Sequence, residues 1–523
     1  MPQLIQSVAS AACLAILFFV LRSAFHRFSR LPLPPGPPKL PLIGNLLQIP
    51  STNQYEVYQR WGEIYDVSRL GVIHVDAVGN SIVILNTAKA AWDLLDKRSR
   101  IYSSRPAAPM VNDLMGWGWT TASQAYGETW RAHRRIVGQA LNVNAVKIFR
   151  SNQVKATHFL LSRLLEDPES YFELLKNHSA RIIMSIAYGL DVKLTNDPWV
   201  TMAEDALIPM MKALTPGAFL VNSLPFLKHV PSWLPGAGFK RKARKWKTLT
   251  DRFLHTPFAA AKETVLSGEY STSFVSESLQ RLDDDEPVRV QEQEDIIRQA
   301  AGDMYIGGAD TTAAAMVSFL FAMLVNQDVQ HKAQEEVDRV SSGRLPTFED
   351  EKAMPYVTAV VWESLRWISI TPLAVPHYSD AEDVYNGYRI PKGSVIVSNV
   401  WAILHDENMY PEPYDFKPER YFKPGTNEFN ETIQSPTFAV FGFGRRICPG
   451  RHLGYASLWI GVVSLLKTFT ISKARDKQGN IIEPVYDLRG SLVVAPRPFK
   501  CSITPRSAEA EGLILAANDE VEE

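Results

Sequence analysis

The chain has 523 residues, of which 46% are hydrophobic and 21% are charged, a composition typical of a large folded enzyme. Its 55 basic residues nearly balance its 56 acidic ones, and no basic run with interleaved aromatic residues occurs, so nucleic acid is not an expected partner. The cysteines, at positions 13, 448 and 501, are too scattered for a disulfide framework or a zinc site.

The first predicted element is an uncharged apolar run from Leu4 to Leu21. As a helix it would be about 27 Å long, close to the hydrocarbon thickness of a membrane. A cleaved secretory signal is the alternative, but the basic residues Arg22, Arg27 and Arg30 follow the run instead of preceding it. We therefore predict a single-pass membrane anchor with its basic flank over residues 1–30, and a cytoplasmic location for the rest.

Three boundaries follow along the chain. Residues 31–45, LPLPPGPPKLPLIGN, are rich in proline, which excludes both a helix and a central strand, so they are predicted to be a stiff hinge. Residues 46–504 contain no repeat and no second linker, which indicates one domain. Residues 505–523 end acidic and without apparent apolar periodicity, which predicts a disordered acidic tail.

Within the domain, helices are expected to dominate. Short β-branched runs at 81–85 and 394–399 predict strands, and longer apolar runs at 248–266 and 295–325 predict helices. The expected fold class is therefore mainly α with small β-sheets.

The helix predicted over 295–325 is unusual because Gly302, Gly307 and Gly308 lie inside an apolar pattern, where each costs about 1 kcal/mol relative to alanine. Asp310 and Thr311 follow, and a threonine hydroxyl in mid-helix can bond to the preceding turn and open the helix. We interpret this segment as a bent helix that presents an acid and an alcohol to a flat group lying against its glycines. The alternative is a pair of helix-packing glycines followed by surface polar residues.

Two further charged features precede the cysteine at position 448. Glu363 and Arg366 are three residues apart on a predicted helix and can pair, although an exposed pair contributes only about 0.2–1 kcal/mol. Arg420 lies in a stretch rich in proline and aspartate that is predicted to be irregular. An arginine in such a stretch can dock a buried carboxylate through two hydrogen bonds and hold the loop to a helix.

The segment FGFGRRICPG, residues 441–450, places Cys448 after Arg445 and Arg446 and just before a predicted helix. Nearby cations and a helix N-terminus favour a thiolate over a thiol. A nucleophilic cysteine would need a histidine base, for which only His452 is near. A thiolate that is the sole protein ligand of a metal fits haem, in which the porphyrin supplies four nitrogen ligands.

These motifs together resemble the cytochrome P-450 family of haem-thiolate monooxygenases, from the apolar N-terminal run to about residue 504. The helix motif of the family is matched by GGADTT at 307–312. The cysteine loop and the salt-bridge triad are matched by Phe441, Gly444, Arg446, Cys448, Gly450, Glu363, Arg366 and Arg420. The family's Trp-x-x-x-Arg motif and its Pro-His element are matched by Trp130, Arg134, Pro376 and His377.

The resemblance implies the cytochrome P-450 fold and haem b, with Cys448 as the axial iron ligand. The propionates of the haem would be held by Trp130, Arg134, His377 and Arg446. Gly308 and Phe441 are further expected cofactor contacts, and Glu363, Arg366 and Arg420 are expected to form a structural triad. Without the family, Trp130 would be interpreted as a core aromatic residue and Arg134 as a solvated helix charge.

The implied reaction inserts one oxygen atom from O2 into an unactivated C–H bond. NADPH would supply two electrons, one at a time, through a partner similar to NADPH–cytochrome P-450 reductase, while Asp310 and Thr311 relay protons. No nucleotide-binding glycine motif follows a predicted strand, in keeping with electrons that arrive through another protein.

The substrate is predicted from segments that face the pocket in the family: the loop before Trp130, residues 371–375 and residues 487–494. They are mostly apolar, so we expect a small apolar substrate. The hinge and the cysteine loop are most similar to fungal microsomal members of secondary metabolism, which implies the endoplasmic reticulum membrane and a terpenoid or polyketide-type skeleton. The alternatives are a haem-thiolate isomerase or dehydratase that rearranges a peroxide without O2, and a non-catalytic haem sensor or carrier.

Overall fold

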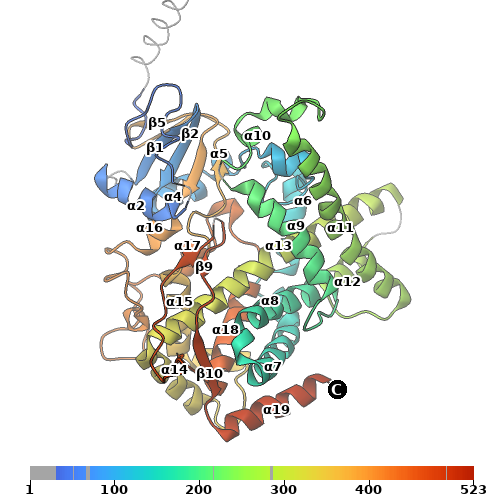
Figure 1. Ribbon diagram of the computed structural model, residues 1–523, viewed down its shortest axis with the longest axis vertical. Helices are drawn as coiled ribbons and strands as arrows, with labels where there is room; N and C mark the ends of the chain where they lie inside the picture. Colours follow the sequence, from blue (N-terminus) through green and yellow to red (C-terminus); the bar gives the residue numbers. More distant parts are fainter. Residues whose placement is uncertain are drawn as a thin grey trace, which may run out of the picture.

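The computed structural model describes residues 31–522 except 51, 66–70, 216, 283–286 and 491. The predicted membrane anchor and its basic flank, residues 1–30, lie outside the described residues. In the described part, long helices make up most of the molecule, and the small sheet that contains β1 and β2 lies at one end of it (Figure 1). Several two-stranded ladders complete the fold. The prediction of a mainly α fold with small β-sheets is confirmed.

The helices in chain order are α2 (Gln54–Ile64), α4 (Ala88–Ala91), α5 (Ser99–Tyr102), α6 (Glu128–Ala140), α7 (Arg150–Glu166), α8 (Tyr171–Tyr188), α9 (Pro198–Leu214), α10 (Leu220–Ser223), α11 (Gly238–Ser267), α12 (Phe274–Leu279), α13 (Pro287–Val325), α14 (Gln327–Val340), α15 (Pro355–Trp367), α16 (Val400–Leu404), α17 (Thr437–Val440), α18 (Arg451–Thr468) and α19 (Ala508–Glu522). Short 3₁₀ or π turns are η1 (Trp92–Lys97), η2 (Met110–Leu114), η3 (Ala145–Phe149), η4 (Pro168–Ser170), η5 (Pro225–His229), η6 (Phe348–Ala353), η7 (Pro418–Tyr421) and η8 (Gly444–Arg446). The strands are β1 (Val72–Ala77), β2 (Asn80–Leu85), β3 (His377–Tyr378), β4 (Asp383–Tyr385), β5 (Tyr388–Ile390), β6 (Val395–Ser398), β7 (Phe469–Lys473), β8 (Leu488–Arg489), β9 (Ala495–Pro496) and β10 (Cys501–Pro505).

The largest described sheet has the strand order β1-β2-β6-β3. Its two central strands, β2 and β6, correspond to the strands predicted at 81–85 and 394–399, and they pair in parallel with Val83 opposite Ile396. β-Branched residues suit such positions because they pack well on a pleated surface. The short edge strand β3 pairs antiparallel with β6 and places His377 opposite Ile396.

The proline-rich hinge has no regular structure, as predicted, but it is not a free spacer. The His74 N–H of β1 donates a hydrogen bond to the carbonyl of Pro35 at 2.9 Å, and the Arg389 N–H of β5 donates to that of Pro32 at 2.8 Å. A Cβ atom at Gly36 would lie 2.1 Å from the His74 carbonyl oxygen, so only glycine permits this close approach. The hinge is therefore docked on the first strands.

Helix α13 crosses the middle of the molecule and packs on α6, α8, α11 and α18 (Figure 1). Most of its length from Ile297 onward is buried, which explains why the sequence is apolar on nearly every side. Among the described residues, Val290–Val325 is the one helix long and apolar enough to cross a membrane, but 72% of its most apolar window is buried inside the fold. It is therefore a core helix of the domain.

The prediction of a disordered tail over residues 505–523 was wrong. Residues 508–522 form helix α19, which packs on α7 and α18. Ala510, Ile514 and Ala517 are buried and recur every three or four residues, so one narrow face docks on the domain. The neighbouring Arg506 Nη2 anchors the start of the helix to Asp338 Oδ2 at 2.6 Å. The acidic residues that flank this short stripe, among them Glu509 and Asp519, hid it in the sequence.

Truncation of the docking face of α19 is expected to destabilise the domain. Ile514 is fully buried, so Ile514→Ala should lower the free energy of unfolding by about 2–4 kcal/mol. Its neighbour Leu515 is 53% exposed, and Leu515→Ala should change that free energy by less than about 0.5 kcal/mol. Urea denaturation of the two variants measures the difference; equal effects would contradict the docked helix.

Candidate functional site

Cys448 lies two residues before α18, in a loop that folds back on itself. Its N–H donates a hydrogen bond to the Phe441 carbonyl at 2.7 Å. Gly444 adopts a φ of +57°, and a Cβ atom there would lie 2.1 Å from the Leu95 carbonyl oxygen of η1. The glycines of this motif therefore serve to press the loop against η1 and to fix the position of the cysteine.

The cations that act on Cys448 differ from those expected. Burial raises the pKa of the Cys448 thiol, while the Gly450 N–H, Arg134 and Arg451 lower it. Arg445 instead bonds the hydroxyl of Tyr126 at the surface. Arg451 was missed in the sequence although it lies only three residues after the cysteine. Within the described residues, no group of three His, Cys, Asp or Glu side chains could hold a metal ion.

Arg446 is buried and held from several sides. Its guanidinium lies over the ring of Trp130, 4.4 Å from the centroid. It donates hydrogen bonds to the carbonyls of Ser103 at 2.6 Å, Thr121 at 2.8 Å and Gln124 at 2.7 Å. These bonds use three of the five guanidinium N–H donors, so two remain to bind an acceptor outside the loop.

Arg105 is a functional candidate that the sequence analysis missed. Its Nη1 donates to the carbonyls of Val375 at 2.7 Å and Pro376 at 2.9 Å, while its Nε is buried without a partner among the described residues. Burial and the nearby Arg446 lower the pKa of Arg105 to about 9. A single arginine before a proline carries no periodic signal, and its partners lie about 270 residues away in the chain.

His377 belongs to the same cluster. Its Nδ1 donates to the Tyr102 carbonyl at 2.6 Å, and burial together with Arg105 and Arg446 holds the pKa of His377 well below its usual value. The acid that favours the charged form of Arg446 is Asp380, whose carboxylate already accepts a hydrogen bond from Ser104 at 2.6 Å.

Positive charge is therefore in excess in this corner of the fold. A buried Arg105 donor without a partner among the described residues, the two remaining donors of Arg446 and a thiol nearby fit a planar metal cofactor that carries carboxylates. Haem, with its two propionates, fits this set of donors.

Helix α13 carries an accessible stripe on one side. Ile306, Gly307, Asp310 and Thr311 keep accessible surface and lie on one side of the helix, whereas Met304, Tyr305 and Ala309 are buried. A reactant could therefore approach this core helix along a single face.

Gly308 packs closely on a neighbouring helix. A Cβ atom at Gly308 would lie 2.8 Å from Ile183 Cδ1 of α8, so this glycine allows close helix packing, as the alternative interpretation expects. A Cβ atom at Gly307 would meet nothing within 4 Å, and Gly307 lies on the accessible stripe. The cofactor contact at Gly308 stays a prediction.

The acid and the alcohol lie side by side on this stripe. Thr311 Oγ1 donates to the Gly307 carbonyl at 2.6 Å, the backward bond that the sequence predicted, yet α13 remains one continuous helix. Desolvation by the surrounding protein raises the pKa of the Asp310 carboxyl, whereas the positive charge of Lys176 on α8 lowers it. Lys176, which sequence analysis missed, also lies 3.9 Å from Glu204, a second acid whose side chain is half exposed. Asp310 thus has a charged route toward the surface.

Glu363, Arg366 and Arg420 form the predicted network, and it is buried. The side chains of Glu363 and Arg366 are fully buried, with Arg366 Nε and Nη2 at 2.8 and 2.9 Å from the carboxylate oxygens. Arg420 Nε lies 3.1 Å from Glu363 Oε1, and the Tyr421 hydroxyl donates to Glu363 Oε2 at 3.1 Å. The network ties α15 to the irregular segment around η7.

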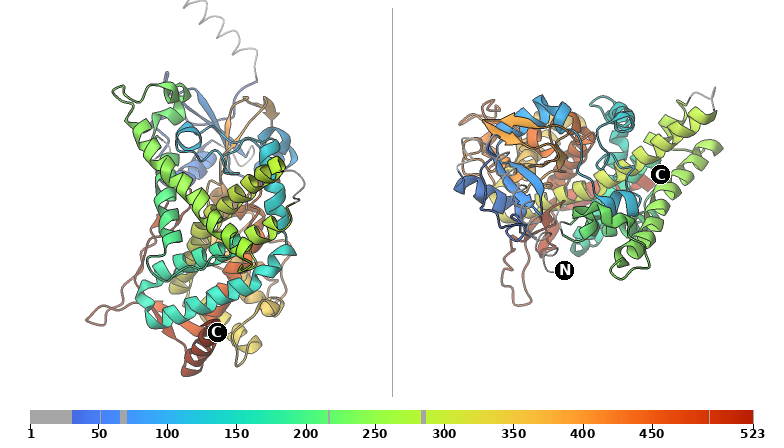
Figure 2. Two further views of the ribbon diagram at one scale, coloured as in Figure 1. Left: turned by 90° about the vertical axis from the view of Figure 1, so that its right-hand side faces the viewer. Right: turned by 90° about the horizontal axis from the view of Figure 1, so that it is seen from above.

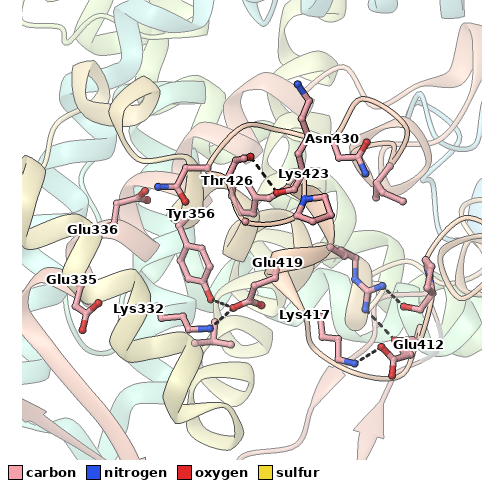
Figure 3. Close-up of a pocket in the computed structure, with 18 of the residues that line it drawn as sticks. Lys332, Glu335, Glu336, Tyr356, Glu412, Lys417, Glu419, Lys423, Thr426 and Asn430 are labelled. Carbon is pink, nitrogen blue, oxygen red and sulfur yellow. Dashed lines mark hydrogen bonds and ion pairs between the residues drawn. The ribbon is translucent and has the colours of Figure 1, made fainter.

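An open depression of about 1210 Å³ lies beside this network, lined by α14, Tyr356 and the segment 411–433 (Figure 3). Its charged groups are paired with one another: Glu419 Oε1 accepts from Lys332 Nζ at 2.7 Å and from the Tyr356 hydroxyl at 2.8 Å, and Lys417 pairs with Glu412 (Figure 3). Its lining comes from elements other than α13 and the cysteine loop. We therefore interpret it as a structural feature of the surface and not as the reaction site.

A cysteine in a cation-rich corner, in a fold whose core helix carries an accessible acid and alcohol, is the arrangement of a haem-thiolate oxygenase. Residues 34–503 match the family model described as Cytochrome P450. The chain is 44% identical to cytochrome P450 monooxygenase 98 of Postia placenta, covering 94% of each chain. It is 42% identical to cytochrome P450 monooxygenase ple1 of Rhodocybe pseudopiperita, covering 92% of this chain and 91% of the relative. It is 38% identical to tryptamine 4-monooxygenase of Psilocybe cyanescens, covering 92% and 95%.

The chain therefore belongs to the cytochrome P450 family, whose members bind haem and take a redox partner, O2 and a small-molecule substrate. The names of these fungal relatives support monooxygenase activity for this protein.

Loss of the buried carboxylate at Glu363 is expected to strand two arginines. Glu363→Ala should lower the free energy of unfolding by about 3–5 kcal/mol. The matched control is Glu428→Ala, which removes an exposed ion pair with Lys423 and should cost at most about 1 kcal/mol. Urea denaturation and the haem content of the purified proteins provide the comparison. Unchanged stability of Glu363→Ala would contradict a structural role for the triad.

Proposed function

We propose that this protein is a membrane-anchored monooxygenase of the endoplasmic reticulum that oxidises an apolar small molecule with O2 and electrons from NADPH. The observation that carries the proposal is the position of Cys448 beside an excess of buried positive charge from Arg105, Arg134 and Arg446. Haem b, when bound, supplies the binding and activation of O2. The proposed substrate is a terpenoid or polyketide-type secondary metabolite.

The proposed roles around the cofactor follow from charge. Cys448 would hold the haem iron through its thiolate, and Arg134 and Arg451 favour the thiolate because both lower the pKa of the thiol. Arg105 and Arg446 would bind the propionates through their remaining N–H donors, and the Trp130 ring supports Arg446. A carboxylate beside His377 would raise the pKa of that histidine and allow its Nε2 to donate as well.

Proton delivery is assigned to Asp310 and Thr311. The Thr311 hydroxyl lies on the accessible stripe of α13. Because its one O–H donates to the Gly307 carbonyl, its oxygen can accept a hydrogen bond from a reactant, and the neighbouring Asp310 can supply a proton. Lys176 of α8 and Glu204 of α9 would connect Asp310 to solvent, because both side chains are half exposed.

An apolar substrate is supported by the aromatic residues above α13. The ring centroids of Trp117 and Trp119 are 5.6 Å apart, those of Trp117 and Phe253 are 5.8 Å apart, and Phe253 packs on Tyr305 at 5.8 Å. Trp117, Phe253 and Tyr305 are buried in the core cluster that α13 shares, so the protein beside this helix is apolar and suits an apolar ligand better than a polar one. The substrates named for the relatives are not all apolar, since one relative is named for the monooxygenation of tryptamine, an amine.

An NADPH–cytochrome P-450 reductase is the proposed electron donor. Exposed cations gather beside the cysteine loop: Arg131 and Arg445 lie 5.6 and 5.1 Å from the ring centroid of Tyr126, and Arg135 is exposed on the same helix as Arg131. A basic face next to Cys448 suits an acidic flavoprotein domain and steers its association.

Membrane contact is supported by large apolar side chains that are exposed around the hinge and around α10 and η5. Figures 1 and 2 place α10 and the first strands toward the same end of the molecule. The most exposed members of this set are Leu42 (95%), Leu47 (75%), Leu220 (69%), Phe226 (64%) and Trp233 (79%). Exposed apolar groups of this size indicate contact with an apolar phase.

Replacement of the cysteine tests the cofactor assignment. The reduced, CO-bound protein should show the long-wavelength Soret band typical of thiolate-ligated haem, and Cys448→Ala should abolish it. Cys501→Ser is the control, because Cys501 lies on β10 in a two-stranded ladder with β7, and it should leave the band unchanged. An unchanged band in Cys448→Ala would refute the axial assignment. NADPH consumption with added reductase, substrate and O2 separates the monooxygenase from an isomerase or a carrier.

Removal of the alcohol tests the proton route. Thr311→Ala should still bind haem, CO and substrate, and NADPH oxidation should continue. Product should fall while hydrogen peroxide rises, because the hydrogen bond that directs protons to oxygen is lost. Asp310→Asn should instead slow turnover as a whole. If product formation in Thr311→Ala stays fully coupled to NADPH oxidation, protons arrive by another route and this pair is not catalytic.

A further inference from the structure

The segment from Trp117 to Gln124 joins η2 to α6 without regular structure, so side chains must hold it in place. Trp117 is fully buried in the core. Trp119 packs against α13, since a Cβ atom at Gly302 would come within 2.8 Å of its ring. These contacts fix the apolar start of the segment but leave the backbone of Thr121 and Gln124 to be fixed by hydrogen bonds.

Thr121 is held from two opposite sides. Its backbone N–H donates to Asp303 Oδ2 of α13 at 2.8 Å, and its hydroxyl forms a second hydrogen bond with the same carboxylate. Its carbonyl accepts from Arg446 Nη1 at 2.8 Å, and the Gln124 carbonyl accepts from Arg446 Nη2 at 2.7 Å. One residue thus connects the core helix to the arginine of the cysteine loop.

A charged Asp303 is unfavourable at this position because its carboxylate is removed from water. Burial raises the pKa of its carboxyl to about 7, against the two hydrogen bonds from Thr121, which lower it. Among the described residues it makes no ion pair within 4 Å, and the titratable neighbour that it affects is Tyr188 of α8. Its bonding partner is Thr121, so the interaction that accounts for this acid is the attachment of the segment.

We propose that Asp303 is a positioning residue: its carboxylate fixes Thr121, and Thr121 in turn holds the Arg446 guanidinium in the orientation that binds a haem propionate. The inference rests on the proposed haem site but assigns Asp303 no contact with haem or substrate. What the segment needs from Asp303 is a hydrogen-bond acceptor. An asparagine keeps an acceptor oxygen without the charge, whereas leucine or alanine removes it.

The buried negative charge of Asp303 lowers the stability of the folded protein, and this effect can be measured separately. The pKa of Asp303 in the folded protein lies above its unfolded value, so the folded protein holds this proton more tightly. The free energy of unfolding therefore falls as the pH rises from about 4 to about 7. Asp303→Asn should remove this contribution and flatten the profile.

The experiment measures the rate of haem transfer from the full-length holoprotein to excess apomyoglobin. Asp303→Leu should lose haem about tenfold faster than the wild type, as expected for one lost buried hydrogen-bond acceptor, and Asp303→Asn should stay within about twofold. Asp295→Leu is the control on the same helix, because Asp295 is 43% exposed and pairs with Arg298; it should leave the rate unchanged. Asp303→Ala replaces Asp303→Leu if the larger side chain prevents folding.

Hydrogen–deuterium exchange of peptides covering residues 116–127 provides the second readout. Exchange there should rise in Asp303→Leu or Asp303→Ala and stay near the wild-type value in Asp303→Asn. Wild-type rates of haem loss and exchange in the Leu and Ala variants would overturn the proposal. So would equal defects in Asn and Leu, which would indicate that the charge matters and not the acceptor. Failure of the haem assignment is recognised separately, because the wild type would then lack the thiolate Soret band.

Discussion

Uncompensated positive charge in the interior is the constraint on which this structure depends. Arg105, Arg134 and Arg446 come from an early loop, helix α6 and the cysteine loop, and the short strand β3 adds His377 to them. Burial lowers the pKa of all four groups, a sign that the fold by itself disfavours their charge. A carboxylate-bearing cofactor would offset this cost and would link the four segments to one another.

The buried triad shows the opposite solution to the same problem. Glu363 receives two arginines, the Tyr421 hydroxyl and the Lys417 N–H, so that a buried anion is satisfied entirely within the chain. The two sites have different roles. The triad fixes α15 and the segment before the cysteine loop without any cofactor, whereas Arg446 of the cysteine loop retains N–H donors that can bind one. A cofactor site built on a rigid frame in this way loses little conformational freedom on binding.

The sequence could predict those parts of the site whose residues lie close together in the chain. The cysteine loop, the Asp310–Thr311 pair and Glu363 with Arg366 are local motifs, and local geometry determines what they do. Arg105 and Lys176 act on partners far away in sequence, so no pattern of residue spacing predicts their roles. The role of Gly308 depended in the same way on Ile183 of another helix, which the sequence does not place beside it. The tail could not be predicted because three buried residues suffice to dock a short helix on an existing surface.

The docked hinge has a mechanical consequence. Because Pro32 and Pro35 are already hydrogen bonded to β5 and β1, Leu31 alone separates the last described attachment from residue 30, a span of about 3.5 Å. The chain therefore enters the domain at a fixed point beside β1 and β5, and the described part of the hinge adds no free linker between that point and the strands.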